Sequence, residues 1–213
     1  MDSVQPLKTA LLMSGGMDSL CVAWWKRPSF GITVDYGQLA AEAEIVASKA
    51  ICEQLKIQHH LICIDCRSLG SGDMAGTVPD MYAPASDWWP YRNQMLVTFA
   101  AMKAISLGVQ EILLGTVKSD GTHQDGTPRF LSAMSALLEL QEGGMKVSAP
   151  AIEMSTVELV LRSNVPLHLL AWAHSCHKAN VACGNCRGCN KYFDVLRELD
   201  DGMDRPRESA SAA

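Results

Sequence analysis

The sequence has 213 residues, of which 48% are hydrophobic, and its 18 Lys and Arg against 23 Asp and Glu give a formal net charge of -5. This length and composition predict one soluble domain, or one domain with a small appendage, that buries its core without disulfides. The acidic balance argues against a protein that binds nucleic acid by charge, and no apolar run is long enough to span a membrane. No early segment resembles a secretory signal, so we expect a cytoplasmic protein.

The first third of the chain alternates short apolar runs with segments of helical periodicity. The runs 9–13, 30–34 and 60–64 predict buried strands, whereas 18–25 and 40–55 predict helices. This βαβαβ order is typical of a parallel sheet.

The same alternation continues after a long loop at 67–90, which is rich in Gly, Ser, Asp and Pro. Loops of this length are usually functional or disordered. Ser155, with Glu158 three residues later, has the spacing of a capping box and predicts a helix that ends near residue 163. The other predicted elements are a helix at 93–107, a strand at 111–114, a helix at 129–140 and a short strand at 146–150.

These elements predict an α/β fold with a Rossmann-like parallel sheet that is covered by helices on both faces. We expect the main domain at 1–165, a helical segment with a small cysteine-rich knot at 166–199, and a flexible tail at 200–213.

The first candidate site is the string "SGGMDS", Ser14 to Ser19, which follows the first predicted strand. No Lys or Arg lies between Thr9 and Trp25, which excludes the kinase-type phosphate loop, and no third glycine follows to make a dinucleotide fingerprint. Small residues before a helix N-terminus still let backbone N–H groups converge on an anion. The structural alternative is a plain turn from strand to helix.

The second candidate site is a cysteine cluster near the carboxyl end, spaced C-x6-C-x2-C-x2-C. Four thiolates at this spacing predict a tetrahedral structural zinc site, with an iron–sulfur cluster or free cysteines as the alternatives. The other four cysteines, Cys21, Cys52, Cys63 and Cys66, are predicted to be buried thiols. The predicted metal ligands are Cys176, Cys183, Cys186 and Cys189.

The six-residue string resembles the S-G-G-x-D-S loop of N-type ATP pyrophosphatases, which holds the pyrophosphate that leaves when ATP adenylates a substrate. Together with the cysteine knot, it resembles the 7-cyano-7-deazaguanine synthase (QueC) family. The strings "DYGQ" at 35–38, "RN" at 92–93, "GTVKSD" at 115–120 and "HSC" at 174–176 support this resemblance, which covers roughly residues 8 to 197.

The resemblance implies an adenine nucleotide alpha hydrolase-like fold and an AMP-forming carbon–nitrogen ligase that uses ATP, Mg²⁺ and structural Zn²⁺. Such an enzyme adenylates 7-carboxy-7-deazaguanine, forms an amide with ammonia and converts the amide to a nitrile with a second ATP. Relatives commonly form homodimers, and no membrane or nucleic-acid partner is implied.

Carried over by position, the resemblance assigns roles to three groups of residues. The alternative for Arg92 is a surface charge without a role, and the alternative for Asp120 is a simple turn residue. Trp88, Trp89 and Tyr91 suggest a stacking platform for a purine, or else a hydrophobic plug. The catalytic group is Asp18, Arg92 and Asp120; the nucleotide-binding group is Ser14, Gly15, Gly16, Met17, Asp18, Ser19, Tyr36, Gly37 and Gln38; the substrate-binding group is Trp89, Tyr91, Arg92, Asn93 and Asp125.

Departures from the family pattern lie at Leu39, Ala40, Tyr91 and Asp125, close to the expected acceptor substrate. One alternative is therefore a diverged enzyme, as in bacterial antiphage defence operons, that passes the activated acyl group to a protein amine. A second alternative is a tRNA base thiolase that uses Cys63 and Cys66, although residues three apart on a strand point to opposite faces. A third is a nucleotide-binding subunit without activity.

Overall fold

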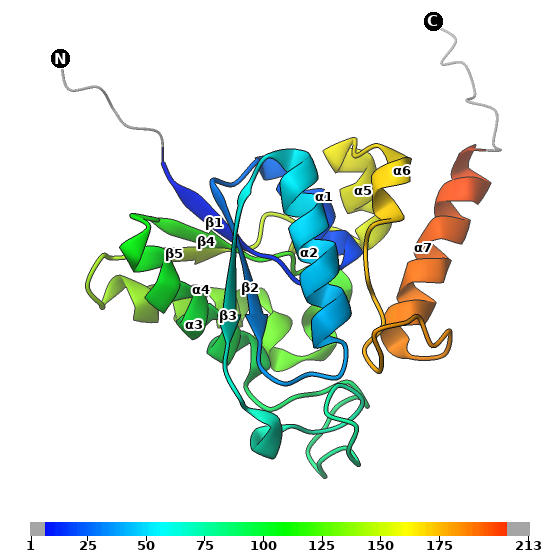
Figure 1. The fold of residues 1–213 in the computed structure, drawn as a ribbon, viewed down its shortest axis with the longest axis horizontal. Helices are drawn as coiled ribbons and strands as arrows, with labels where there is room; N and C mark the ends of the chain where they lie inside the picture. Colours follow the sequence, from blue (N-terminus) through cyan, green and yellow to red (C-terminus); the bar gives the residue numbers. More distant parts are fainter. Residues whose placement is uncertain (1–6, 204–213) are drawn as a thin grey trace, which may run out of the picture.

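The computed structural model describes residues 7–203, and its strands form one parallel sheet in the order β3-β2-β1-β4-β5 (Figure 1). The predicted α/β class is confirmed. The edge strand β3 begins at Gln58, two residues before the predicted start, because it pairs with β2 from Phe30 onwards. The strand bounds are β1 Thr9–Leu12, β2 Phe30–Asp35, β3 Gln58–Cys63, β4 Glu111–Leu113 and β5 Lys146–Ser148.

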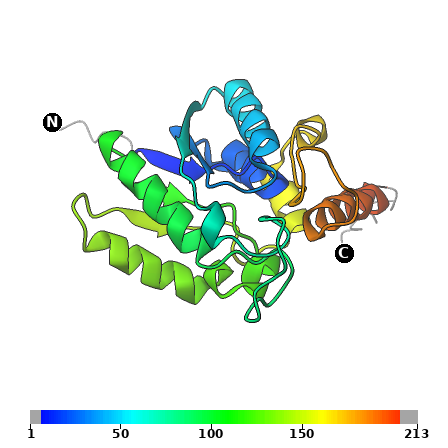
Figure 2. The same ribbon diagram turned by 60° about the horizontal axis from the view of Figure 1, so that its bottom comes forward.

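Helices cover both faces of this sheet, as predicted (Figures 1 and 2). Successive residues of a strand point to opposite faces, so Leu11 packs with α1 and α2 while Ala10 packs with α3 and α4, and both are fully buried. Two hydrophobic cores result, one on each side of the sheet. The helices are α1 Met17–Lys26, α2 Ala41–Leu55, α3 Arg92–Ser106 and α4 Pro128–Glu139.

Three further helices, α5 Thr156–Ser163, α6 Leu167–Leu170 and α7 Arg187–Met203, complete the described chain. The predicted capping box is present at the start of α5, where the side chains of Ser155 and Glu158 each accept from the backbone N–H of the other. Val195 and Leu199 of α7 join the core formed by α1, α2 and α5. Helix α7 continues to Met203, past the predicted start of the tail at 200, and residues 204–213 of that tail lie outside the described residues.

The predicted loop at 67–90 contains one short 3-10 helix, Arg67–Leu69, and otherwise consists of turns and bends. Trp89 anchors this loop to the core. Its side chain is 2% exposed and meets the ring of Tyr36 edge-on, with the ring centroids 4.8 Å apart. The polar segment after β4 folds into two more 3-10 helices, Lys118–Thr122 and Gln124–Gly126.

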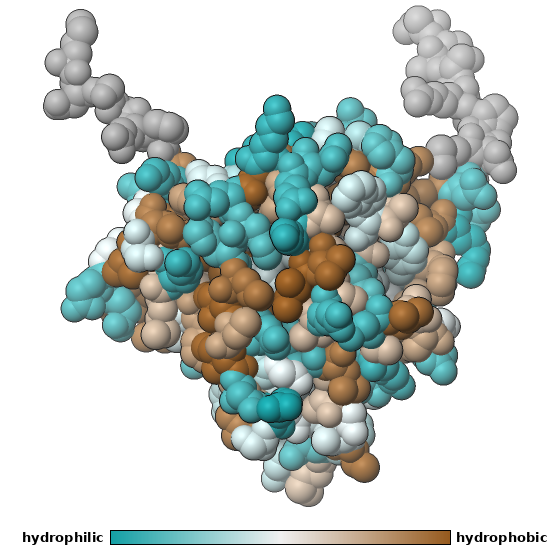
Figure 3. Space-filling view, in the orientation of Figure 1, coloured by the Kyte–Doolittle hydropathy of each residue, from teal (hydrophilic) through white to brown (hydrophobic). Residues whose placement is uncertain are grey.

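Polar side chains cover most of the face in Figure 3, and apolar side chains gather near its middle, around α2 and β3. The exposed apolar residues there include Val46 of α2 and Leu61 of the edge strand β3. Within residues 7–203, no helix is both long and apolar enough to cross a membrane.

Candidate active site

The glycine loop joins the carboxyl end of β1 to the first turn of α1. Gly15 has a φ of 74°, and a Cβ at this position would lie 2.7 Å from the carbonyl oxygen of Glu44 on α2. Gly16 is the N-cap of α1 and supplies no side chain to accept from the N–H groups of the first turn. These N–H groups can therefore bind an anion, which the positive end of the helix dipole also favours.

This loop lines a cavity of about 960 Å³ at the carboxyl ends of β1, β2 and β4. The sheet order changes direction at β1, which lies between β2 and β4, and ligands of open α/β folds bind at this point. The cysteine segment and the first turns of α7 line the cavity as well. The volume is at the upper end of the range for small-molecule sites and suits a nucleotide together with a second substrate.

Two carboxylates beside the loop share one lysine. The Nζ of Lys191 lies 2.8 Å from the Oδ2 of Asp18 and 3.4 Å from the Oδ1 of Asp120. Burial raises the pKa of Asp18, an effect that Lys191 opposes and that Asp120 increases. The Oδ1 of Asp18 is buried and has no hydrogen-bond partner among the described residues. Two converging carboxylates with a free oxygen form a donor set that fits Mg²⁺.

A second group of polar side chains lines the cavity near the carboxyl end of β2. Glu44 accepts a hydrogen bond from the amide of Gln38 at 2.8 Å, and burial raises the pKa of Glu44 to about 7. Burial also raises the pKa of Tyr36. The guanidinium of Arg92 contacts the Sδ of Met74 at 2.8 Å and forms no ion pair within residues 7–203. Arg92 is thus a partly buried cation whose charge no neighbouring carboxylate directly balances.

A third group ties the long loop to the cysteine segment. The carboxylate of Asp87 lies 3.3 Å from Nη1 of Arg187 and 3.4 Å from a ring nitrogen of both His123 and His177. Burial alone would raise the pKa of Asp87, but the hydrogen bond to His123 and the charges of His177 and Arg187 lower it below its usual value. This buried carboxylate therefore connects three segments that form one end of the cavity wall.

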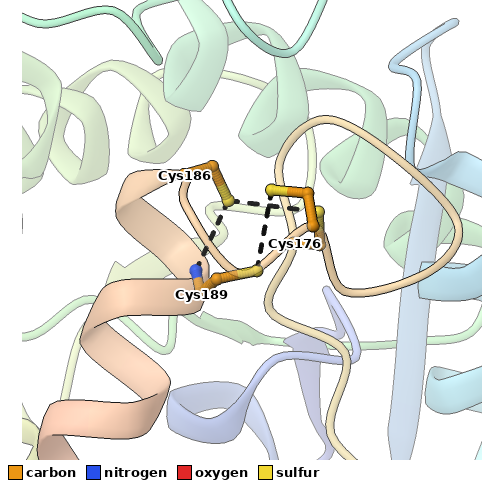
Figure 4. Close-up of side chains that lie close together, drawn as sticks. Cys176, Cys186 and Cys189 are labelled. Carbon is orange, nitrogen blue, oxygen red and sulfur yellow. Dashed lines mark hydrogen bonds between the residues drawn. The ribbon is translucent and has the colours of Figure 1, made fainter.

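The four predicted metal ligands come together, with their sulfur atoms all within 4.8 Å of one another. Figure 4 shows the side chains of Cys176, Cys186 and Cys189 turned towards a common centre. The backbone N–H groups of His177 and Cys189 donate to the Sγ of Cys186 at 3.4 Å and hold this sulfur in place. The donor set can hold a metal ion.

The sequence comparisons agree with this geometry, since the family model described as "Queuosine biosynthesis protein QueC" matches residues 8–199. The chain belongs to the QueC family. A 7-cyano-7-deazaguanine synthase from Methanococcus maripaludis is 29% identical over 221 residues, which cover 90% of this chain and 95% of the relative. A relative of the same name from Desulforudis audaxviator is 30% identical over 210 residues, which cover 87% of this chain and 94% of the relative.

The solved structures include the U34-tRNA thiolase NcsA from Methanococcus maripaludis with its 4Fe–4S cluster, which matches with a TM-score of 0.50 at 15% sequence identity. The match covers 94% of this chain and 67% of that one. At this identity, the likeness supports the fold alone.

The residues to which the family resemblance assigned catalytic, nucleotide-binding or substrate-binding roles fall into two groups: those that line the cavity and those that do not. Most of the glycine loop, both aspartates beside Lys191 and the first residues of α3 line the cavity. Gly15, Gly37 and Gln38 lie outside its lining, although Gln38 contacts it through Glu44. The predicted residues in the lining are Ser14, Gly16, Met17, Asp18, Ser19, Tyr36, Arg92, Asn93 and Asp120.

Three predicted substrate contacts are not in the lining. Trp89 is the hydrophobic plug of the long loop and not a stacking platform, because its ring is buried against Tyr36. Tyr91 has a φ of 52°, a backbone conformation that favours glycine, and is 74% exposed. Asp125 accepts from the backbone N–H of Asn93 at 3.0 Å and therefore orients the start of α3 from behind.

The structure corrects the prediction for one cysteine. It also adds to the candidate site three residues that the sequence analysis did not single out. Cys63 is exposed, because alternate residues of the edge strand β3 face solvent, whereas Cys66 is buried. The added residues are Glu44, Asp87 and Lys191. The sequence could have indicated Lys191, because it lies two residues after the last cysteine of the knot. It gives no such signal for Glu44 and Asp87, which lie in a polar helix face and a polar loop.

Proposed function

We propose that this protein is an ATP-dependent ligase that adenylates the carboxylate of 7-carboxy-7-deazaguanine and converts it, with ammonia, to the nitrile. The observation that carries the proposal is Arg92, a cation without an ion-pair partner in the described chain that faces the same cavity as the glycine loop. An anionic substrate would supply the missing partner. The family membership and the synthase relatives support the same reaction.

In this reaction, a carboxylate oxygen attacks the α-phosphorus of ATP, and the pyrophosphate that the glycine loop holds is the leaving group. The resulting acyl adenylate has a good leaving group, so ammonia can attack the acyl carbon, releasing AMP and a proton to give the amide. A second ATP adenylates the amide oxygen, which releases a second pyrophosphate and one N–H proton, and loss of AMP and the other N–H proton leaves the nitrile. Mg²⁺ held by Asp18 and Asp120 would neutralise charge on the phosphates.

The residues that we propose for binding follow from this reaction. The loop N–H groups and the hydroxyls of Ser14 and Ser19 bind the phosphates, and Arg92 holds the substrate carboxylate against the α-phosphorus. Glu44, with its pKa near neutrality, lies at the same end of the cavity and can accept a proton from ammonium, which frees the ammonia that attacks, or from the nitrogen after the attack.

We further propose that the four-cysteine site binds a single zinc ion. Tetrahedral zinc with bonds of about 2.3 Å places its sulfur atoms about 3.8 Å apart. The Cys183–Cys189 and Cys176–Cys186 sulfur pairs are both 4.0 Å apart. A 4Fe–4S cluster binds each thiolate to a different iron and so needs a wider arrangement of the four sulfur atoms.

Product analysis by mass spectrometry tests the reaction. Protein with ATP, Mg²⁺, 7-carboxy-7-deazaguanine and ammonia should release pyrophosphate and AMP and form the nitrile. Arg92→Met should raise the KM for the carboxylate substrate, while Arg162→Met, on the exposed surface of α5, serves as the matched control. The amide alone would limit the reaction to its first half, and a mass increase on an added protein would indicate conjugation to an amine. Release of neither AMP nor pyrophosphate would refute the proposal.

The remaining partner that we propose is a second copy of the chain. Homodimers are common in the family that the sequence resembles. Light scattering of the purified protein should give a mass of two chains.

A further inference from the structure

We propose that Lys191, on the helix that emerges from the cysteine knot, binds the pyrophosphate that leaves from the glycine loop. The inference rests on the proposed ATP chemistry, to which it adds a phosphate-binding residue. In the state described here, its ammonium group occupies the place between Asp18 and Asp120. With ATP and Mg²⁺ bound, the ammonium would contact the phosphates, and Asp18 and Asp120 would hold the metal.

The first observation is the distribution of positive charge around the cavity. The glycine loop contains no cation, since no Lys or Arg occurs between Thr9 and Trp25. Three other cations besides Lys191 line the cavity within residues 7–203, of which Arg187 is held by Asp87. Arg92 faces the carboxyl end of β2 beside Met74, and the side chain of Lys118 forms no ion pair with the loop. Among the cations that line the cavity within residues 7–203, Lys191 is the one that directly contacts a residue of the glycine loop, Asp18.

The second observation is the position of Lys191 in the chain. It lies two residues after Cys189, in the first turns of α7, and its side chain is 31% exposed into the cavity. The neighbouring residues Asn190, Asp194 and Glu198 also line the cavity. A metal ion in the knot would fix the start of α7 and with it the lysine. This arrangement gives the knot a direct part in phosphate binding, in addition to its contribution to folding.

The third observation is electrostatic. Pyrophosphate leaving the α-phosphorus carries several negative charges, which a mobile ammonium can follow as the bond breaks. Asp18 and Asp120 would repel that anion, and a metal held between them would neutralise them while the ammonium contacts the phosphates. A lysine is suited to this exchange because its long stem lets one charge reach either set of oxygens.

The test compares Lys191→Met with Lys178→Met. Lys178 is a matched control because it also belongs to the cysteine segment and pairs with an aspartate, Asp73 at 3.2 Å, but it does not line the cavity. Calorimetry measures the affinity of each variant for inorganic pyrophosphate with Mg²⁺. Lys191→Met should weaken pyrophosphate binding at least tenfold and lower the rate at which pyrophosphate is formed from ATP about 100-fold. Lys191→Arg should keep binding within about threefold of the wild type.

A second measurement distinguishes phosphate binding from a purely structural ion pair. Without nucleotide, Lys191→Met should bind Mn²⁺ more tightly than the wild type, because the ammonium no longer competes for Asp18 and Asp120. Electron paramagnetic resonance of free Mn²⁺ gives this affinity. If Lys191→Met does not fold, Lys191→Gln takes its place, since the amide can still donate to Asp18.

The proposal would be overturned if Lys191→Met, or Lys191→Gln in its place, bound pyrophosphate as tightly as the wild type. It would also be overturned if Lys178→Met lost as much pyrophosphate affinity as Lys191→Met. Wild-type protein that binds pyrophosphate but yields no product from 7-carboxy-7-deazaguanine would refute the proposed substrate, while the variants would still decide the role of Lys191. If the wild type binds no pyrophosphate, both proposals fail.

Discussion

Glu44 should make the stability of the folded protein depend on pH, and replacing it should remove that dependence. Burial in the cavity wall raises its pKa from 4.5 to about 7. A carboxyl whose pKa rises on folding stabilises the native state below the pKa of the unfolded chain, and this stability is lost as the pH rises through the folded pKa. A tenfold change in proton affinity corresponds to about 1.4 kcal/mol, so the ionised form costs the folded protein about 3 kcal/mol above neutrality.

The substitution Glu44→Gln keeps the size of the side chain and an oxygen that accepts from Gln38, but it carries no charge. Its free energy of unfolding should exceed that of the wild type by less than about 1 kcal/mol at pH 5 and by about 3 kcal/mol at pH 8. Urea denaturation at the two pH values, with zinc present throughout, measures this difference.

A matched control is Glu53→Gln, on the same helix but exposed and 4.0 Å from Lys49. Its difference from the wild type should be small and change little with pH. The reasoning about Glu44 would be wrong if the advantage of Glu44→Gln grew by less than about 1 kcal/mol between pH 5 and pH 8.

Three further substitutions test other parts of the structure. Cys186→Ser should lower the zinc content and the melting temperature, because a zinc site with four thiolate ligands contributes about 10 kcal/mol to folding, whereas Cys63→Ser should change neither; elemental analysis and circular dichroism measure both. Asp87→Asn should destabilise the protein by about 1 to 3 kcal/mol in urea, since it removes the charge that holds Arg187 and a carboxylate oxygen that faces the buried rings of His123 and His177, and an unchanged midpoint would contradict this. Ser155→Ala should cost about 1 kcal/mol through loss of the α5 capping box, and Ser119→Ala in the exposed loop should cost less.

The local part of this structure could be predicted from sequence because short-range patterns determine it. The strands, the helix starts and the loop at 67–90 follow from periodicity, capping residues and glycine or proline content. The prediction for Ser155 and Glu158 was correct at the level of single hydrogen bonds, because both partners lie within one turn. The cysteine spacing likewise predicted a cluster, because three of its four members lie within seven consecutive residues.

The part that the sequence could not settle depends on where distant segments meet. Trp89 and Tyr91 have the same aromatic character in the sequence, but the path of the long loop buries the first and exposes the second. The edge position of β3 exposes Cys63, and no local pattern distinguishes an edge strand from a central one.

The sequence by itself determined the family, the parallel sheet, the glycine loop and the set of cysteines that could hold a metal, because each is encoded by residues close together in the chain. Only the tertiary structure placed Lys191 against Asp18, 173 positions away in the chain. It also buried Glu44 in the cavity wall and joined Asp87 to the cysteine segment. These contacts set the charges at the site, and they depend on the packing of α2, α7 and the long loop around the carboxyl ends of the strands.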